Sequence, residues 1–335
     1  MFDVELTDSC NNACRHCYNS WRHCVSRRPT SEREPLTARQ IRDVVRAVGR
    51  DVKLRYVALT GGEPTLRPDF VSIVRGIVDD GITPMIITNG VRLNGSLLRR
   101  LPSGLTYEIT ILSHRAEVHN ALAGRPVFED VVRNIAAIEK HGSRCVVAFV
   151  ATRLNAIDVY RTVELAIALG ASALMYNRLN IGVGVRGHER ELVPPAELLR
   201  NSLLLLQEAV RNYRFPIACT IPIPPCVVDH RPFPDLHLSW CPRGGRDAYY
   251  TVGSTGLLRP CNHSSTVLGD MLRSGFLELA QSPKARAFWQ EIPTVCRKCE
   301  QALKDACQGG CLAAADEYYG NRLRPDPICE LALSV

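Results

Sequence analysis

The feature that most constrains the fold is a regular alternation of strand-like and helix-like segments over the first two-thirds of the chain. Short apolar runs predict strands, whereas apolar residues spaced by three or four predict helices. Strands are predicted at 2–7, 54–60, 83–88, 105–113, 144–152 and 173–181. Helices are predicted at 37–49, 70–78, 97–101, 128–141, 156–169 and 195–213. This order is typical of a parallel sheet with right-handed crossovers.

Six strand–helix units are too few for the eight that close a complete barrel. We therefore predict an α/β fold: a partial (β/α)6 TIM barrel at 1–215, followed by a small cysteine-rich α+β domain at 241–335. Between them, prolines interrupt any helix, and residues 216–240 are predicted to be a bridge. Residues 249–258 predict a small hairpin. In barrels of this kind the chemistry lies at the C-terminal ends of the strands.

Composition narrows the class of protein. The 335 residues are 46% hydrophobic, which is ordinary for a globular chain, and no apolar run is long enough to span a membrane. The N-terminus has no secretory signal pattern, so a cytoplasmic location is expected. The net charge of +7 comes without a basic stripe, so neither nucleic acid nor membrane is an expected partner. Fourteen cysteines in a cytosolic chain indicate metal binding or catalysis rather than disulfides.

Three of these cysteines, Cys10, Cys14 and Cys17, share one short loop directly after the first predicted strand. Thiolates are soft ligands that suit zinc or iron–sulfur clusters. Three is one short of a closed tetrahedral zinc site, for which His16 and His23 are the only local additions, but it suits a [4Fe–4S] cluster with one open iron. The second predicted strand ends at a different motif, Gly61-Gly62-Glu63-Pro64.

Together these motifs resemble the CxxxCxxC loop and the GGEP motif of radical S-adenosylmethionine (SAM) enzymes, and the resemblance covers residues 1–215. It implies that SAM binds the open iron and is cleaved to a 5′-deoxyadenosyl radical when the cluster is reduced. It also implies cofactor-binding roles for a set of residues in the loop and at the strand ends: His16, Gly61, Gly62, Glu63, Asn89 and Ser113. The plainer alternatives are a tight turn at the glycines and another turn at Asn89-Gly90.

The last third of the chain resembles the SPASM domain, which carries two auxiliary [4Fe–4S] clusters. The resemblance implies that Cys241, Cys261 and Cys311 hold the first auxiliary cluster. The cysteines implied for the second are Cys296, Cys299, Cys307 and Cys329. One spacing departs from the family, since seven residues rather than five separate Cys299 from Cys307. The first cluster lacks a fourth ligand, which we expect from Cys226 or, less readily, Cys219; zinc is the alternative at the second site.

Four further residues near the cysteine motifs are interpreted separately. Cys145 lies in an apolar strand and is expected to be a buried small hydrophobe, while Cys24 is an unassigned loop thiol. Asn262 stands where sulfatase-maturing relatives carry a catalytic aspartate, which argues against formylglycine formation. His263 is the candidate catalytic residue because an ordinary histidine pKa suits proton transfer; the alternative is a histidine packed near the cluster.

The resemblance extends to the pyrroloquinoline quinone biosynthesis enzyme and to other peptide maturases. It predicts an enzyme that cleaves SAM reductively and oxidatively crosslinks a ribosomally made peptide. Because the first cluster cysteine is residue 10, a separate small recognition protein is expected, together with a flavodoxin- or ferredoxin-like electron donor. The alternatives are a dehydrogenase or epimerase acting on an aminoglycoside-like sugar, and a tetrapyrrole-modifying enzyme. A non-catalytic iron–sulfur or zinc module is a different class, which the intact loop and glycine motif disfavour.

Overall fold

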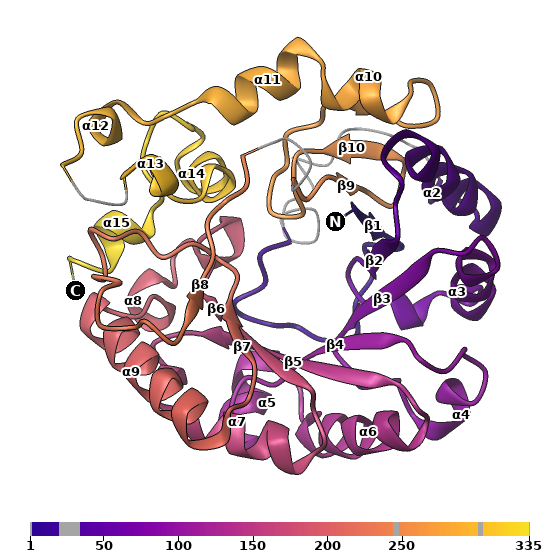
Figure 1. Cartoon of the computed structure of the whole chain (residues 1–335), viewed down its shortest axis with the longest axis horizontal. Helices are drawn as coiled ribbons and strands as arrows, with labels where there is room; N and C mark the ends of the chain where they lie inside the picture. Colours follow the sequence, from indigo (N-terminus) through magenta and orange to yellow (C-terminus); the bar gives the residue numbers. More distant parts are fainter. Residues whose placement is uncertain (1, 20–33, 244–247, 301–303, 335) are drawn as a thin grey trace.

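The computed structural model describes residues 2–19, 34–243, 248–300 and 304–334. The structure has one curved sheet, with its strands in the order β11-β10-β9-β1-β2-β3-β4-β5-β6-β7-β8 (Figure 1). The strands are β1 (Phe2–Glu5), β2 (Tyr56–Thr60), β3 (Thr83–Thr88), β4 (Thr106–Thr110), β5 (Arg144–Ala151), β6 (Ala173–Arg178), β7 (Ile217–Cys219), β8 (His237–Leu238), β9 (Thr251–Val252), β10 (Leu257–Arg259) and β11 (Gly269–Asp270). Strands β1 to β6 are parallel neighbours, and the sheet does not close, so the predicted partial barrel is confirmed.

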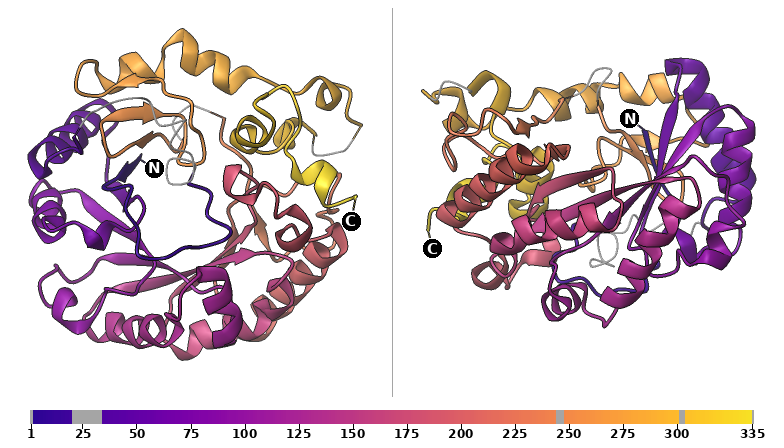
Figure 2. Two further views of the ribbon diagram at one scale, coloured as in Figure 1. Left: turned by 180° about the vertical axis from the view of Figure 1, so that it is seen from behind. Right: turned by 60° about the horizontal axis from the view of Figure 1, so that its bottom comes forward.

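Helices surround the sheet on its outer side (Figure 2). Those of the barrel are α2 (Ala38–Val52), α3 (Phe70–Asp79), α4 (Gly95–Leu98), α5 (Ala116–Ala123), α6 (Phe128–Lys140), α7 (Val159–Ala168), α8 (Glu189–Leu192) and α9 (Ala196–Tyr213). Those of the last third are α10 (Phe276–Ala280), α11 (Pro283–Gln290), α12 (Thr294–Arg297), α13 (Lys304–Cys307), α14 (Leu312–Tyr319) and α15 (Ile328–Leu331). Short 3-10 turns occur at η2 (Pro64–Leu66), η3 (Ala156–Asp158) and η4 (Val183–Val185).

The start of helix α2 agrees with the sequence prediction, and its end does not. Thr37 caps it as predicted, in a capping box with Gln40. The predicted end at Gly49 is wrong, because the helix continues to Val52 and ends where Lys53 adopts the left-handed conformation, with φ 51°. A glycine inside a helix costs only about 1 kcal/mol, which the buried apolar face of α2 offsets.

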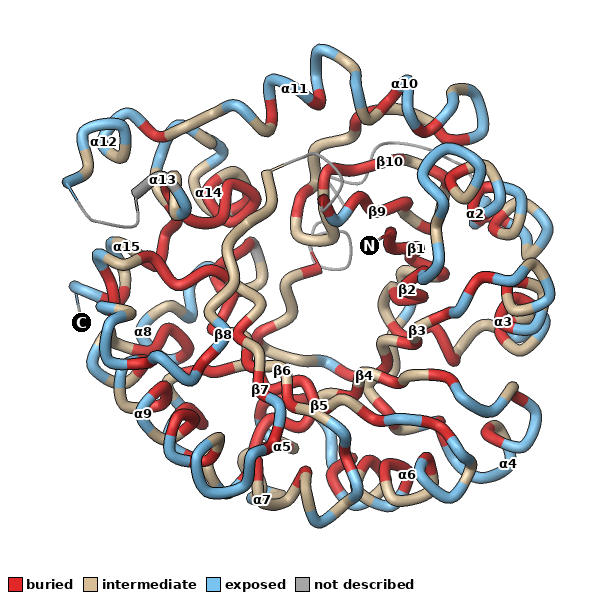
Figure 3. The backbone as a smooth tube through the Cα atoms, viewed as in Figure 1, coloured by how far each residue is buried: buried red, intermediate tan, exposed pale blue. Residues whose placement is uncertain are grey.

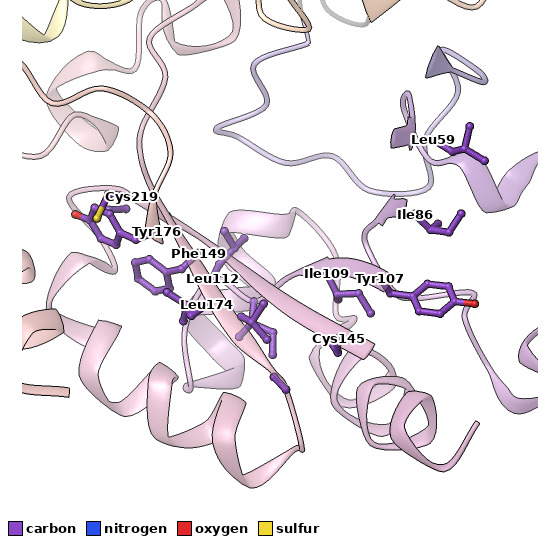
Figure 4. Packing of buried hydrophobic residues seen from close by; sticks show 14 of the residues in the cluster. Leu59, Ile86, Tyr107, Ile109, Leu112, Cys145, Phe149, Leu174, Tyr176 and Cys219 are labelled. Atoms are coloured by element: carbon purple, nitrogen blue, oxygen red, sulfur yellow. The ribbon is translucent and has the colours of Figure 1, made fainter. Parts of the chain in front are cut away.

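The core lies between the outer face of the sheet and the helices. Buried residues follow this layer, while exposed residues gather on the outer sides of the helices (Figure 3). Figure 4 shows Cys145 of β5 and Cys219 of β7 among the apolar side chains of this core. Cys145 is only 3% exposed, so its prediction as a buried small hydrophobe is confirmed, and Cys219 is 1% exposed.

The sheet continues past the end that the sequence predicted for the barrel. Strand β7 pairs with β6 and β8 with β7, although both lie in the segment predicted to be a bridge. The predicted hairpin forms from β9 and β10, and β9 pairs with β1. The cysteine-rich third is therefore joined to the first strand of the barrel. Within the described residues, no helix combines the length and apolarity needed to cross a bilayer.

Candidate functional site

The first cysteine loop follows β1 and is docked against the end of α5, a helix that the sequence did not predict. Ala13 N donates to Ala123 O and Arg15 N to Leu122 O, both at 3.1 Å. Gly124 has φ 70°, and a Cβ there would lie 2.5 Å from Ala13 O, so this approach requires glycine. These contacts fix the backbone that carries Cys10, Cys14 and Cys17. His23 and Cys24 lie outside the described residues.

The glycine turn after β2 packs against the same loop from the other side. Gly62 N donates to Thr7 O at 2.6 Å, and Glu63 N donates to Ser9 O at 2.8 Å. A Cβ on Gly62 would overlap Ser9 O and lie 2.6 Å from its carbonyl carbon. The close approach that these glycines permit is therefore to the three residues that lead into Cys10.

Glu63 lies at the centre of a hydrogen-bond network and is completely buried. Its Oε1 accepts from Thr65 N, Thr65 Oγ1 and Thr88 Oγ1, and its Oε2 accepts from Asn89 N at 2.8 Å. Burial raises the pKa of the carboxyl despite these donors. The Asn89 side chain donates to Asn11 Oδ1 at 2.7 Å and reaches Cys10 Sγ at 3.9 Å. Glu63 and Asn89 thus support the cysteine loop directly, through contacts that the sequence did not reveal.

His16 and Ser113 are also buried. Burial, and then the charge of His119, lowers the pKa of His16 to about 4, so the imidazole beside the cysteines is neutral at pH 7. Ser113 Oγ donates to Asp158 Oδ2 at 2.7 Å and accepts from Arg115 N. Ser113 has no exposed surface, and its contact with SAM stays a prediction.

The two cysteine-rich regions meet at Tyr18. The ring of Tyr18, which follows Cys17, lies 4.4 Å from the ring of His263, and Asn262 Nδ2 donates to Tyr18 Oη at 3.5 Å. Burial, and then the charges of Arg178 and Arg259, lower the pKa of His263 to about 3. His263 packs against the residue that follows the first cysteine loop, and its catalytic role stays a prediction.

The C-terminal cysteines fall into two groups. Cys261 packs against the buried Cys311. Burial raises the pKa of the Cys261 thiol, with smaller contributions from Cys311 and Cys241. Cys226 does not lie with them: its Sγ is 3.9 Å from Cys329 Sγ, in the other group. Its expected place beside the first group is therefore corrected by the fold. Cys219 belongs to the apolar core.

Two buried ion pairs, which the sequence analysis missed, join the barrel to the cysteine-rich third. Arg178, at the end of β6, pairs with Asp326, and both side chains are fully buried. Asp326 Oδ2 also accepts from Cys311 N at 2.9 Å. Arg259 of β10 pairs with Glu5 of β1. In the sequence, only the Asp-Pro-Ile-Cys segment at 326–329 drew attention to Asp326. Nothing in that segment indicates that Asp326 pairs with Arg178.

The thiols of the first cysteine loop have the chemistry of iron–sulfur ligands. Across the described ranges, no three histidine, cysteine or acidic side chains converge on one metal-ion position. A single zinc ion needs ligands about 2.0–2.3 Å from its centre, whereas a four-iron cluster spreads its cysteines over four metal atoms. Backbone and amide N–H groups also point at Cys10 Sγ, from Asn12 and Asn89.

A comparison with known protein families identifies the domain that the first half of the chain forms. The sequence profile described as "Radical SAM superfamily" matches residues 4–166. The chain has a radical SAM domain. Domains of this family are catalytic, so the chain is an enzyme, and SAM and one [4Fe–4S] cluster are the cofactors that the domain implies.

Three curated relatives extend the comparison. The AdoMet-dependent heme synthase of Methanosarcina barkeri is 27% identical over 97% of this chain and 94% of that protein. The PqqA peptide cyclase of Ruegeria pomeroyi is 25% identical over 97% of this chain and 86% of that protein. The mycofactocin maturase MftC of Mycobacterium tuberculosis is 33% identical, but over 50% of this chain and 42% of that protein.

Among solved structures, Streptococcus suis SuiB bound to its precursor peptide SuiA superposes with a TM-score of 0.73, at 16% identity over 98% of this chain and 75% of that one. The enzyme anSMEcpe with bound AdoMet also superposes with a TM-score of 0.73, over 99% and 94%. At 16–17% identity these likenesses show the fold: the partial barrel and the cysteine-rich third are both covered.

Inside the radical SAM domain, the sequence analysis missed two carboxyls on the β1–β4 side of the barrel, of which Asp3 is buried and Glu108 half-buried. Burial raises the pKa of Asp3 and of Glu108 to about 7. Asp3 is 4% exposed, and its Oδ1 has no hydrogen-bond partner within the described part of the chain. Both side chains therefore carry a proton in the folded chain at mildly acidic pH.

This raised pKa predicts a pH-dependent stability. Between about pH 4.5 and 7 the folded chain keeps a proton on Glu108 that the unfolded chain has lost, so the free energy of unfolding falls as pH rises. We expect Glu108→Gln to be more stable than the parent by about 1–3 kcal/mol at pH 8 and equally stable at pH 4.5. Urea unfolding at both pH values measures this, with the exposed Glu117→Gln as control. A stabilisation that does not change with pH would contradict the prediction.

Proposed function

We propose that the chain is a radical SAM enzyme that oxidatively crosslinks a ribosomally made peptide. The observation that carries this proposal is the meeting of the two cysteine-rich regions at Tyr18, Asn262 and His263. A substrate held at this junction would lie between the loop that starts the radical chemistry and the cysteines that follow it in the chain. An enzyme that only generated the radical would not need the second set there.

Three groups of cysteines would hold the clusters. Cys10, Cys14 and Cys17 would bind the cluster that takes SAM, on the loop fixed by α5 and the glycine turn. The auxiliary clusters would use Cys241, Cys261 and Cys311, and then Cys296, Cys299, Cys307 and Cys329. When bound, the cluster on the first loop would supply the electron that splits SAM. An auxiliary cluster would supply an acceptor for an electron from the substrate. Burial keeps the free thiols of the first auxiliary set protonated, so a bound cation is what would hold them as thiolates.

The overall reaction balances as a two-electron oxidation. Bound SAM would supply, with one electron, methionine and a 5′-deoxyadenosyl group that takes a hydrogen atom from the peptide. The peptide would lose one further proton and one electron as its new bond forms, and the cysteines of the last third would hold the cluster that serves as acceptor for this electron. The chain's own residues fix this arrangement: Glu63 and Asn89 support the cysteine loop, and the Tyr18–His263 contact joins the two cysteine-rich regions.

Two relatives support a peptide as substrate. PqqA peptide cyclase is named for its peptide, and it aligns with 97% of this chain. SuiB was solved with its precursor peptide bound, and it shares the fold over 98% of this chain. As part of the same proposal, a separate small protein would recognise the peptide, and a flavodoxin- or ferredoxin-like protein would supply electrons.

The test is an iron and sulfide count after anaerobic reconstitution, followed by an activity assay. Three [4Fe–4S] clusters give about twelve iron atoms per chain. A Cys10→Ala/Cys14→Ala/Cys17→Ala variant is expected to keep about eight and to form no 5′-deoxyadenosine with dithionite. Candidate precursor peptides encoded beside the gene are then assayed for a mass loss of about 2 Da, equal to two hydrogen atoms. A parent protein with about four irons and bound zinc would contradict the auxiliary clusters.

One observation favours a second candidate, a tetrapyrrole-modifying enzyme. The heme synthase of M. barkeri aligns with nearly the whole length of both proteins. The same reconstituted enzyme, given a tetrapyrrole in place of peptides, distinguishes the two. 5′-Deoxyadenosine formation that rises with the tetrapyrrole and not with any peptide would favour this candidate over the crosslinking of a peptide.

A further inference from the structure

Four cysteines are assigned to the second auxiliary cluster, and Cys226 places one further thiol beside one of them. Cys226 comes from the segment predicted to be a bridge. Its Sγ touches that of Cys329, one of these four cysteines.

The distance between the sulfurs of Cys226 and Cys329 bears on whether both can act as metal ligands. Two thiolate sulfurs bound to one tetrahedral metal atom, with bonds of about 2.3 Å, are about 3.8 Å apart. Their Sγ atoms lie 3.9 Å apart in this structure. The two sulfurs therefore lie close enough together for either one to bind the same metal atom.

The backbone around Cys226 is held in place by specific contacts. Arg178 Nε donates to Pro222 O at 2.9 Å, and His230 Nε2 lies 2.8 Å from Ile223 O. Val227 N donates to Pro224 O, which closes the turn that presents Cys226. Because Arg178 also pairs with Asp326, three residues before Cys329, one buried guanidinium positions both thiols.

Resting on the proposed auxiliary clusters, we infer that Cys226 and Cys329 address the same iron of the second cluster, so that either thiolate can complete its coordination. The other three proposed ligands of this cluster, Cys296, Cys299 and Cys307, have no such substitute in the proposal. Cys226 is the more exposed of the pair, and Cys329 is half-buried beside Asp326. An exchange of one thiolate for the other involves no net change of electrons: one Fe–S bond breaks, another forms, and a proton passes from the incoming thiol to the departing thiolate.

Serine variants of the reconstituted full chain test the inference through iron content and the electron paramagnetic resonance of the reduced clusters. We expect Cys226→Ser and Cys329→Ser each to keep the parent's iron, and Cys226→Ser/Cys329→Ser to lose about four atoms per chain. Cys296→Ser is expected to lose the same four by itself. Cys219→Ser is the matched control, because Cys219 precedes the same proline-rich segment but lies in the apolar core. Loss of four irons from Cys329→Ser alone would overturn the inference.

Alkylation of the unmodified chain tests it without any variant that could misfold. Anaerobic holoenzyme is treated with iodoacetamide and mapped by mass spectrometry. Labelling divided between Cys226 and Cys329, and summing to one group per chain, supports the shared iron. Complete labelling of Cys226 with full protection of Cys329 would show that Cys226 is a bystander and overturn the inference alone. A parent protein without a second auxiliary cluster, with about eight irons, would overturn the proposed cofactor set and this inference together.

Discussion

Replacing Arg178 by methionine is expected to lower the free energy of unfolding by about 3–5 kcal/mol. The substitution leaves the Asp326 carboxylate buried without its cation, and it removes the donors to Pro222 O and Leu179 O. Since Asp326 also binds Cys311 N, the damage reaches the cysteine region, and we expect loss of iron from the C-terminal sites. Denaturant unfolding and iron content measure the two effects.

The controls for this prediction are a neighbouring pair and a double variant. Arg324 and Glu330 form an exposed pair, with each side chain 46% accessible, so Arg324→Met is expected to cost less than about 1 kcal/mol. Arg178→Met/Asp326→Asn keeps an acceptor for Cys311 N but removes the uncompensated charge, so it is expected to be more stable than Arg178→Met. Equal stability of the single and double variants would show that the unpaired charge is not the cause.

Replacing Gly62 by alanine is expected to abolish the first cluster. The added Cβ would overlap Ser9 O, so the turn and the loop must separate, breaking the bonds from Gly62 N to Thr7 O and from Glu63 N to Ser9 O. Each lost bond costs about 1 kcal/mol, and the loop loses the support that places Cys10. We expect about four fewer irons per chain and no 5′-deoxyadenosine above background.

Gly275→Ala is the matched control, because a Cβ there meets nothing within 4 Å and the backbone has no left-handed conformation. It is expected to keep the parent's iron and SAM cleavage. A Gly62→Ala protein with full iron content and normal 5′-deoxyadenosine would mean that the loop does not depend on its contact with the glycine turn.

The sequence by itself determined the parts of this protein that depend on near neighbours. Periodicity predicted the six barrel strands, because each strand buries its own apolar residues against helices next to it in the chain. The spacing of Cys10, Cys14 and Cys17 indicated a metal-binding loop, because the three thiols share one short backbone segment. The capping box of α2 and the β9–β10 hairpin are equally local.

The tertiary structure decided everything that depends on residues far apart in the chain. Cys226 and Cys329 meet across 103 positions, and Arg178 and Asp326 across 148, so no local pattern could pair them. Glu63 and Asn89 were identified at strand ends, but their support of the cysteine loop follows from the register that brings β1, β2 and β3 side by side. Buried charges and thiols act on whichever groups surround them, and only the folded chain determines which groups those are.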